Sequence, residues 1–295
     1  MELKKITDKV YYIPGSVNIG VIRDSGSSIL IDTGMDDDNG KKILRLLKEN
    51  NLSVKAIVNT HSHADHCGAN SYIKELTGAK VYAPPIEADI IENTVIEPLC
   101  IFSGARPLKD LENKFLMAKP SKVDYIITEN QITFDDSKLS VVPLPGHSPN
   151  QIGIGVDNVL FCADSLFSKE IIEKHRIPFF IDIDKERETL GFLKRSEYKY
   201  YVPSHAEPRD AITELADLNV KTIDEVEKNI LDTLKENRTT EQVLKSLCDS
   251  YKIEIKTVQQ YYLMNTSTMA YLSSLFNREK IKINIDKNSL FWKRI

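Results

Sequence analysis

A short segment of the chain, residues 60–68, concentrates side chains that bind metal ions. It reads Thr-His-Ser-His-Ala-Asp-His-Cys-Gly, so half of the chain's 6 histidines, His61, His63 and His66, lie close together beside Asp65. Imidazole and carboxylate groups are ligands for zinc, manganese or iron, and zinc is favoured where imidazole predominates. Four such groups are too many for one catalytic ion that keeps an open position, so the segment predicts two divalent metal ions.

Three further candidate ligands lie in equivalent positions, each after a predicted strand. His147 follows Pro-Gly, Asp164 follows Cys-Ala, and His205 follows Pro-Ser. A lone histidine or aspartate in a loop is usually a capping or solvated residue. Three at matching positions favour a shared metal site instead, because loops held by a rigid sheet commonly carry functional groups. His175 lies outside the pattern among charged residues, and we expect it at an exposed helix end.

The elements that would hold these residues alternate between strands and helices. Runs rich in Val, Ile, Leu and Tyr predict strands at residues 28–31, 56–59, 139–144, 158–163 and 199–202. Apolar residues at three- and four-residue spacings predict helices at residues 39–49, 68–76 and 186–193. This alternation indicates an α/β core.

The other segments break this rhythm. Residues 84–122, which contain Pro84, Pro85 and a Ser-Gly-Ala-Arg-Pro turn, are expected to form an inserted cap of short helices. After Pro208, the pattern predicts a connecting helix at 210–218, amphipathic helices at 223–234, 240–251 and 256–276, and a β-hairpin at 280–295. We therefore expect a catalytic domain at residues 1–210 and a small helical, winged-helix-like domain at residues 211–295.

The motifs, taken in order, resemble those of the metallo-β-lactamase superfamily. Asp32 in Ile-Asp-Thr-Gly, the His-x-His-x-Asp-His segment, His147 after Gly146, Asp164 and His205 match its five motifs across residues 8–208. The resemblance implies a four-layer αββα sandwich, with the metals at one edge of the two sheets. Asp32 would be the carboxylate that hydrogen-bonds and orients the ligands.

The same resemblance distributes the ligands between two metal ions. One ion would be held by His61, His63 and His147, the other by Asp65, His66 and His205, with Asp164 as the bridge. It implies hydrolysis by a hydroxide that bridges the two ions and attacks an electrophilic carbonyl or phosphorus. Asp65 and Asp164 are the candidates for accepting or moving a proton.

Within this superfamily the sequence favours a dinuclear-metal-dependent hydrolase of a small ester, thioester or lactone, similar to glyoxalase II and the lactonases. Residues 84–122 and 166–180 would form an apolar wall around such a small-molecule substrate. Two alternatives stay open. One is a single-strand endoribonuclease or phosphodiesterase, which would use a basic C-terminal domain. The other is a sulfur dioxygenase-like oxidoreductase with one iron.

Composition limits the partners of the chain. The 295 residues carry 39 basic and 43 acidic side chains, so the net charge of -4 gives no overall attraction for nucleic acid. Residues 251–295 nevertheless hold eight Lys and Arg against three acids, so a local nucleic-acid contact is the minority prediction. No apolar run is long enough for a membrane, and no signal sequence is evident, so we expect a cytoplasmic protein. The tail hairpin and the cap are candidate surfaces for a homodimer.

Overall fold

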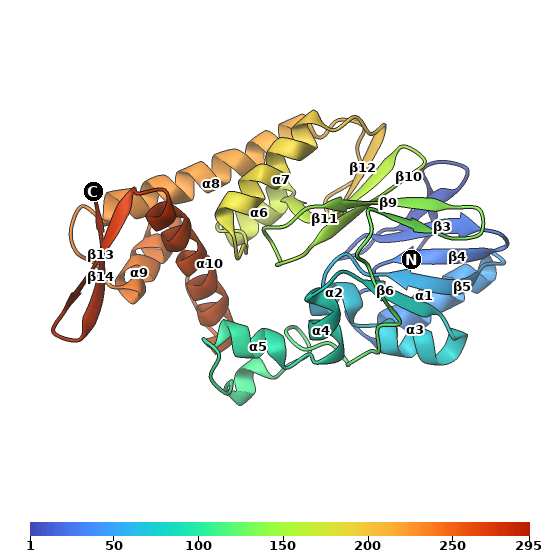
Figure 1. Cartoon of the computed structure of the whole chain (residues 1–295), viewed down its shortest axis with the longest axis horizontal. Coiled ribbons are helices and arrows are strands. Elements are labelled where there is room, and N and C mark those ends of the chain that lie inside the picture. The colour runs from blue at the N-terminus through green and yellow to red at the C-terminus, as the bar shows by residue number, and fades with distance from the viewer.

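A sheet of seven strands forms the N-terminal half of the chain in a computed structural model that describes all 295 residues (Figure 1). Its strands lie in chain order: β1 Lys4–Lys5, β2 Val10–Ile13, β3 Ile19–Asp24, β4 Ser27–Ile31, β5 Ser53–Val58, β6 Lys80–Ala83 and β7 Tyr125–Ile126. The pairs from β1 to β4 are antiparallel, whereas those from β4 to β7 are parallel. Because Ile31 of β4 pairs with Val58 of β5, the residues that follow these strands emerge at the same edge.

A second sheet of five strands is also mixed. Its order is β12 Tyr200–His205, β11 Val159–Phe167, β10 Ile152–Val156, β9 Lys138–Pro143 and β8 Gln131–Thr133. Only β11 and β12 are parallel neighbours. Buried apolar residues of both sheets, such as Ile29 of β4 and Phe161 of β11, form one cluster and so pack the sheets face to face.

Helices cover the outer face of each sheet (Figure 1). α1 Asp37–Glu49 and α3 Asn70–Thr77 cover the first sheet, and α7 Ile183–Arg195 and α8 Thr213–Thr233 cover the second. α1 begins where the Asp36 side chain caps the Asn39 N–H, and its Ile43, Leu46 and Leu47 lie on one buried face. The four layers follow the arrangement that the sequence resemblance implied.

The remaining elements surround the edge where the candidate ligands lie. They are α2 Ala64–Cys67, α4 Glu87–Glu92, α5 Ile96–Ile101, the 3-10 helix η1 Lys109–Leu111 and α6 Lys169–His175. The C-terminal region adds α9 Thr240–Tyr251, α10 Val258–Asn277, β13 Ile281–Asp286 and β14 Ser289–Arg294. Short helices at 84–122, helices near 240–251 and 256–276, and a terminal hairpin are therefore all present as predicted.

One helix differs from the prediction. The segments 210–218 and 223–234 were expected as separate helices, but α8 runs unbroken from Thr213 to Thr233. Asn219, a weak helix former, lies at the expected break. It is buried, and its side chain hydrogen-bonds both the N–H (3.1 Å) and the carbonyl (3.0 Å) of Phe167 at the end of β11. This contact with the second sheet holds the helix continuous where local propensity is poor.

Two strands also extend beyond their predicted ends. β11 continues past Ala163 to Phe167, and β12 continues to His205, so Asp164 and His205 lie within strands rather than after them. Ala163 has a φ of 52°, and the pairing of β11 with β12 shifts register on both sides of it. Such a bulge changes the direction of a side chain locally without ending the strand, which a hydrophobic pattern does not reveal.

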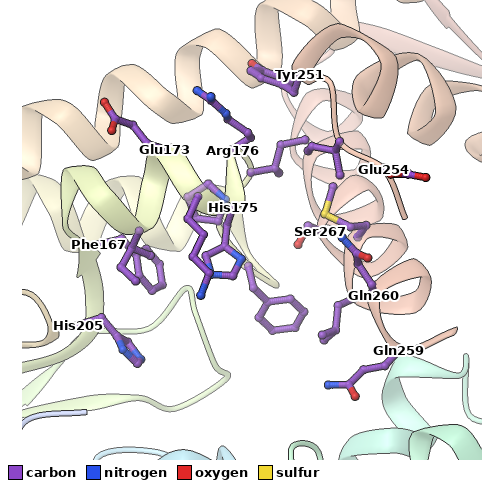
Figure 2. Close-up of a pocket in the computed structure, with 18 of the residues that line it drawn as sticks. Phe167, Glu173, His175, Arg176, His205, Tyr251, Glu254, Gln259, Gln260 and Ser267 are labelled. Carbon is purple, nitrogen blue, oxygen red and sulfur yellow. The ribbon is translucent and has the colours of Figure 1, made fainter. Parts of the chain in front are cut away.

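A cavity of about 870 Å³ opens between the second sheet and the C-terminal region (Figure 2). Phe167, Ile177 and Phe179 line one side of it, as predicted for residues 166–180. The opposite wall comes from α10, with Leu263 and Met264, and not from residues 84–122 as expected. The segment 84–122 packs against the N-terminal part of α10 instead, where the Phe102 and Tyr262 rings lie 5.0 Å apart.

No helix of the chain has both the length and the hydropathy that crossing a membrane requires.

Gly68 tests the close packing beneath the metal-binding segment. A Cβ at this position would lie 1.9 Å from the carbonyl oxygen of Met35, a backbone atom that cannot move aside easily. We expect Gly68→Ala to lower the free energy of unfolding by about 1–3 kcal/mol. Gly191→Ala is the control, because its Cβ would meet nothing closer than 3.4 Å and alanine favours a helix by about 0.5–1 kcal/mol. Denaturant unfolding that ranks the two variants the other way would contradict this packing.

Candidate metal centre

Asp32 connects the end of β4 to the segment that follows β5. Its buried carboxylate accepts hydrogen bonds from the N–H (2.8 Å) and hydroxyl (2.7 Å) of Thr60, and it lies 2.8 Å from Nδ1 of His66. Its backbone has a φ of 62°, which aspartate tolerates better than most residues. Because Asp32 holds Nδ1 of His66, the other ring nitrogen, Nε2, is left to face the site.

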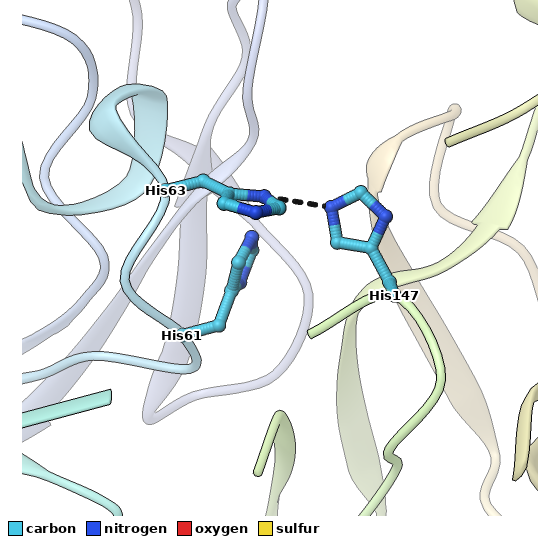
Figure 3. Close-up of side chains that lie close together, drawn as sticks. All are labelled: His61, His63 and His147. Carbon is cyan, nitrogen blue, oxygen red and sulfur yellow. Dashed lines mark hydrogen bonds between the residues drawn. The ribbon is translucent and has the colours of Figure 1, made fainter. Parts of the chain in front are cut away.

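His61, His63 and His147 form one group of convergent side chains (Figure 3). Nδ1 of His63 lies 2.8 Å from Nε2 of His147. The other ring nitrogen of His147 lies 2.8 Å from the carbonyl of Phe179, which only accepts, so Nδ1 carries the proton and Nε2 presents a lone pair. Three imidazole rings held with their nitrogens together are the arrangement of a metal site.

Asp65, His66 and His205 form a second group. Nε2 of His205 lies 3.6 Å from Asp65, while its Nδ1 faces the carbonyl of Ser16 at 2.8 Å. Asp65 is in the first turn of α2, so the short helix turns its carboxylate and the ring of His66 toward the same point.

Asp164 lies between the two groups. Its carboxylate oxygens are 3.1 Å from Nε2 of His205, 3.2 Å from Nε2 of His66 and 3.4 Å from Nε2 of His147. The structure thus brings together all eight residues that the sequence analysis singled out for the site. They are Asp32, His61, His63, Asp65, His66, His147, Asp164 and His205.

The buried polar atoms at the centre fit a metal ion. Nε2 of His61 is buried and has no hydrogen-bond partner, and the buried Nε2 of His66 meets only Oδ1 of Asp164, at 3.2 Å. Buried polar atoms nearly always have a partner, so an unpartnered imidazole nitrogen beside a buried His–Asp pair fits a site that binds a cation. Each is a good ligand for a divalent transition metal.

The charges of the cluster point to the same conclusion. Burial lowers the pKa of His61 well below its usual value and that of His147 to about 4, so both rings are neutral and able to bind a metal near pH 7. Burial opposes the charge of His66 as well, but Asp164 and Asp32 raise its pKa well above the usual value. Burial also opposes the charge of Asp164, yet His205 and His66 lower its pKa. A proton is therefore held among the ligand atoms of His66 and Asp164, and a metal ion that binds there would displace it.

Comparison with known proteins agrees with this geometry. Residues 12–205 match the sequence profile of the metallo-beta-lactamase superfamily, which covers most of the chain and all the residues of the cluster. The chain belongs to the metallo-beta-lactamase superfamily. Its His and Asp groups form the kind of metal site that is typical of enzymes of that superfamily.

Its relatives are distant. Hydroxyacylglutathione hydrolase 1 of Vibrio vulnificus is 28% identical over 152 residues, which cover 51% of this chain and 47% of that protein. The probable metallo-hydrolase YqgX of Bacillus subtilis is 26% identical over 182 residues, which cover 59% of this chain and 79% of that protein. The chain thus spans about half the length of the hydroxyacylglutathione hydrolase that it matches.

Solved structures extend the likeness to nearly the whole chain. A beta-lactamase domain protein from Burkholderia ambifaria has a TM-score of 0.76 at 14% identity, covering 99% of this chain and 93% of its own. A metallo-beta-lactamase family protein from Thermus thermophilus has a TM-score of 0.74 at 16% identity, covering 98% of this chain and 99% of its own. At such identities the likeness establishes the fold, including the C-terminal helical region.

Glu87 is a residue of the site that the sequence analysis missed. Its buried carboxylate accepts hydrogen bonds from the N–H (3.0 Å) and hydroxyl (2.6 Å) of Ser62, between two ligands, and from the hydroxyl of Ser148 (2.8 Å), beside a third. Ile86, before it, has a φ of 67°, a genuine outlier for a β-branched residue. The strained turn places Glu87 where it joins the two ligand loops. No sequence motif reveals this role, because it depends on the contact of Glu87 with Ser148, which lies 61 residues further along the chain.

Glu186 is a second buried carboxyl group that the motifs do not reveal. It packs against Gly146, where a Cβ would lie 2.6 Å from the Glu186 Cα, so a glycine is required before His147. Both carboxyl oxygens of Glu186 are buried without a partner. Burial, and then the charge of Asp164, raises the pKa of Glu186 well above its usual value. The native protein therefore keeps this proton at pH values where an exposed glutamate has lost it.

Replacement of Glu87 tests its role in positioning the ligands. In Glu87→Gln an amide N–H group replaces one acceptor oxygen and faces a donor, so one ligand loop loses its support. We expect zinc affinity to fall by about 10–100-fold while the fold is kept. Glu92→Gln is the matched control, because Glu92 is on the same helix and accepts only from the Val123 N–H. Equal zinc affinity of the two variants, measured by competition with a chelator, would show that Glu87 does not position the ligands.

The raised pKa of Glu186 should make the free energy of unfolding depend on pH. Above its ordinary pKa, near 4.3, the unfolded chain has lost this proton but the native protein keeps it, so ionisable Glu186 lowers the free energy of unfolding as pH rises. Glu186→Gln removes this effect. As pH rises above about 4.3, the variant should gain up to about 1.4 kcal/mol per pH unit relative to the wild type in urea unfolding of the metal-free proteins, for as long as the native carboxyl group keeps its proton. A difference that stays constant would mean that Glu186 is ionised in the native state.

Proposed function

We propose that the chain hydrolyses a small ester, thioester or lactone with the help of two divalent metal ions, zinc in the first instance. The observation that carries this proposal is the convergence of seven His and Asp ligands, of which His147 and His205 also line a partly apolar cavity. The relatives named for hydrolysis of hydroxyacylglutathione support a small acyl substrate.

The two groups of side chains support the number of ions. His61, His63 and His147 would hold one ion, Asp65, His66 and His205 the other, and Asp164 would contact both. When bound, two such ions supply Lewis-acid activation of water and stabilise developing negative charge on the substrate.

The protein's own residues then orient the reactants. Asp32 and Glu87 hold the ligand loops, so the rings need little rearrangement to bind metal. Asp65 is the partly exposed carboxylate of the cluster, and its oxygen lies on the His205 side, where the cavity begins. It is placed to accept the proton of an attacking water and pass it to solvent. Asp164, almost fully buried, serves to hold the two groups together.

We also propose that the C-terminal region, residues 211–295, is a winged-helix-like unit that shapes the substrate cavity. Its three helices are followed by the β13–β14 hairpin, which packs on the start of α9 through a hydrogen bond from the Trp292 indole to Thr240. Trp292 is buried, and Tyr262 packs on Phe102, so neither offers a free face for stacking on a base. The contribution of α10 to the cavity favours the small-molecule function.

The experiment is an assay of metal-stripped protein reloaded with zinc, manganese or iron, on a thioester, a lactone, a phosphodiester and single-stranded RNA. We expect zinc- or manganese-dependent turnover of the thioester or the lactone and two ions per chain. Asp164→Asn should lose at least one ion and more than about 100-fold in activity, because its carboxylate contacts both groups. Asp249→Asn, an exposed aspartate of α9 paired with Lys245, is the matched control.

Other results would favour the alternatives. Turnover of RNA alone would make the chain a nuclease. A single iron ion per chain and no hydrolysis of any of the four substrates would favour the sulfur dioxygenase-like alternative.

A further inference from the structure

The cavity beside the metal centre has two chemically different parts. Phe167, Ile177, Phe179, Leu263 and Met264 supply apolar lining next to the ligands His147 and His205. The lining also includes Lys174, His175, Arg176 and Lys252, all exposed to solvent. In Figure 2, Arg176 and Tyr251 lie at the edge of the cavity away from His205 and Phe167.

The cations of this rim are not neutralised by the acids beside them. Glu173 and Glu254 also line the cavity, but Glu173 pairs with Lys169 (3.8 Å) and Glu254 with Lys256 (3.1 Å), and neither lysine faces the cavity. Lys174, Arg176 and Lys252 form no salt bridge. The rim is therefore a local excess of positive charge in a chain whose net charge is -4.

The backbone at two of these cations is unfavourable. Arg176 has a φ of 63° and lies at the centre of a tight turn, in which the N–H of Ile177 bonds the carbonyl of His175 (2.7 Å). Lys252 has a φ of 56° at the end of α9, where the N–H of Ile253 bonds the carbonyl of Cys248 (2.8 Å). Glycine is the usual residue at both kinds of position. A glycine would relieve the backbone strain at both positions. Because the chain has a charged residue at each of them instead, and both line one cavity, we take the two side chains to have a role there.

We propose that the substrate arm that enters this cavity is apolar next to the scissile bond and carries an anionic group, phosphate or carboxylate, which the rim cations Lys174, Arg176 and Lys252 bind. This inference rests on the proposed hydrolysis at the metal centre. The apolar section accepts the chain next to the reacting carbonyl, and the rim meets the charge at its far end. An anion there replaces water around exposed cations and leaves no charge buried.

Three thioesters with matched chains test the inference on the zinc-loaded full chain. They are S-hexanoylpantetheine, which is neutral, S-adipoylpantetheine, with a carboxylate on the acyl arm, and S-hexanoyl-4′-phosphopantetheine, with a phosphate on the thiol arm. We expect at least one anionic thioester to have a KM more than tenfold below that of the neutral one. Which of the two it is identifies the arm that enters the cavity.

Glycine variants separate ligand binding from a structural role of the cations. Arg176→Gly and Lys252→Gly relieve the positive-φ backbone, so the fold should be as stable as the wild type or more so. Together they should raise the KM of the preferred anionic thioester at least tenfold more than the KM of the neutral thioester. Lys245→Gln, which removes a cation from the outer side of α9, should change neither.

The outcomes distinguish this inference from the proposed function. Equal KM values for all three thioesters, or a KM for the anionic thioesters that the glycine variants do not alter, would overturn the anionic subsite while hydrolysis stands. If no thioester is hydrolysed, the proposed function fails, and calorimetric titration of the same intact thioesters decides about the subsite. The anionic subsite is supported if an anionic thioester binds more tightly than the neutral one and the glycine variants lose this difference. Equal binding of the anionic and neutral thioesters would refute the subsite.

Discussion

The concentration of metal-ligand atoms in a place with little water is the constraint on which the rest of the structure depends. Five imidazole rings and the nearly buried carboxylate of Asp164 converge there, and Nε2 of His61 has no hydrogen-bond partner while Nε2 of His66 meets only Asp164. Such a cluster is costly for a protein unless a cation binds there. The surrounding fold compensates by fixing three of the five rings from behind, through Asp32, Phe179 and Ser16. The metal-binding capacity is thus inseparable from the hydrogen bonds behind the ligands.

Much of this arrangement was predictable from the sequence, because it follows from local patterns. The apolar runs before Asp32, His61 and His147 correspond to β4, β5 and β9, and the ends of these strands meet at one edge of the paired sheets. The types and spacing of the side chains in residues 60–68 predict metal binding without any knowledge of the residues around them. Motifs that couple a strand end to a ligand carry both the fold and the site in a few residues.

What the sequence did not reveal depends on contacts between distant segments. The bulge at Ala163, the continuity of α8 through Asn219 and the contact of Glu87 with Ser148 each require a partner far along the chain. The wall of the cavity was assigned to residues 84–122 for the same reason. That segment is apolar enough, but it packs on α10, and α10 itself faces the cavity. Apolar periodicity shows that a helix has a buried face, but it does not show what the face meets.

The central claim is that this cluster holds two metal ions joined by Asp164. The most direct test is a crystal structure of the zinc-loaded protein with anomalous diffraction recorded on both sides of the zinc absorption edge. The account predicts two anomalous peaks at full occupancy, one within bonding distance of His61, His63 and His147 and one of Asp65, His66 and His205, with Asp164 contacting both. A single peak, or two peaks of which neither contacts Asp164, would contradict it.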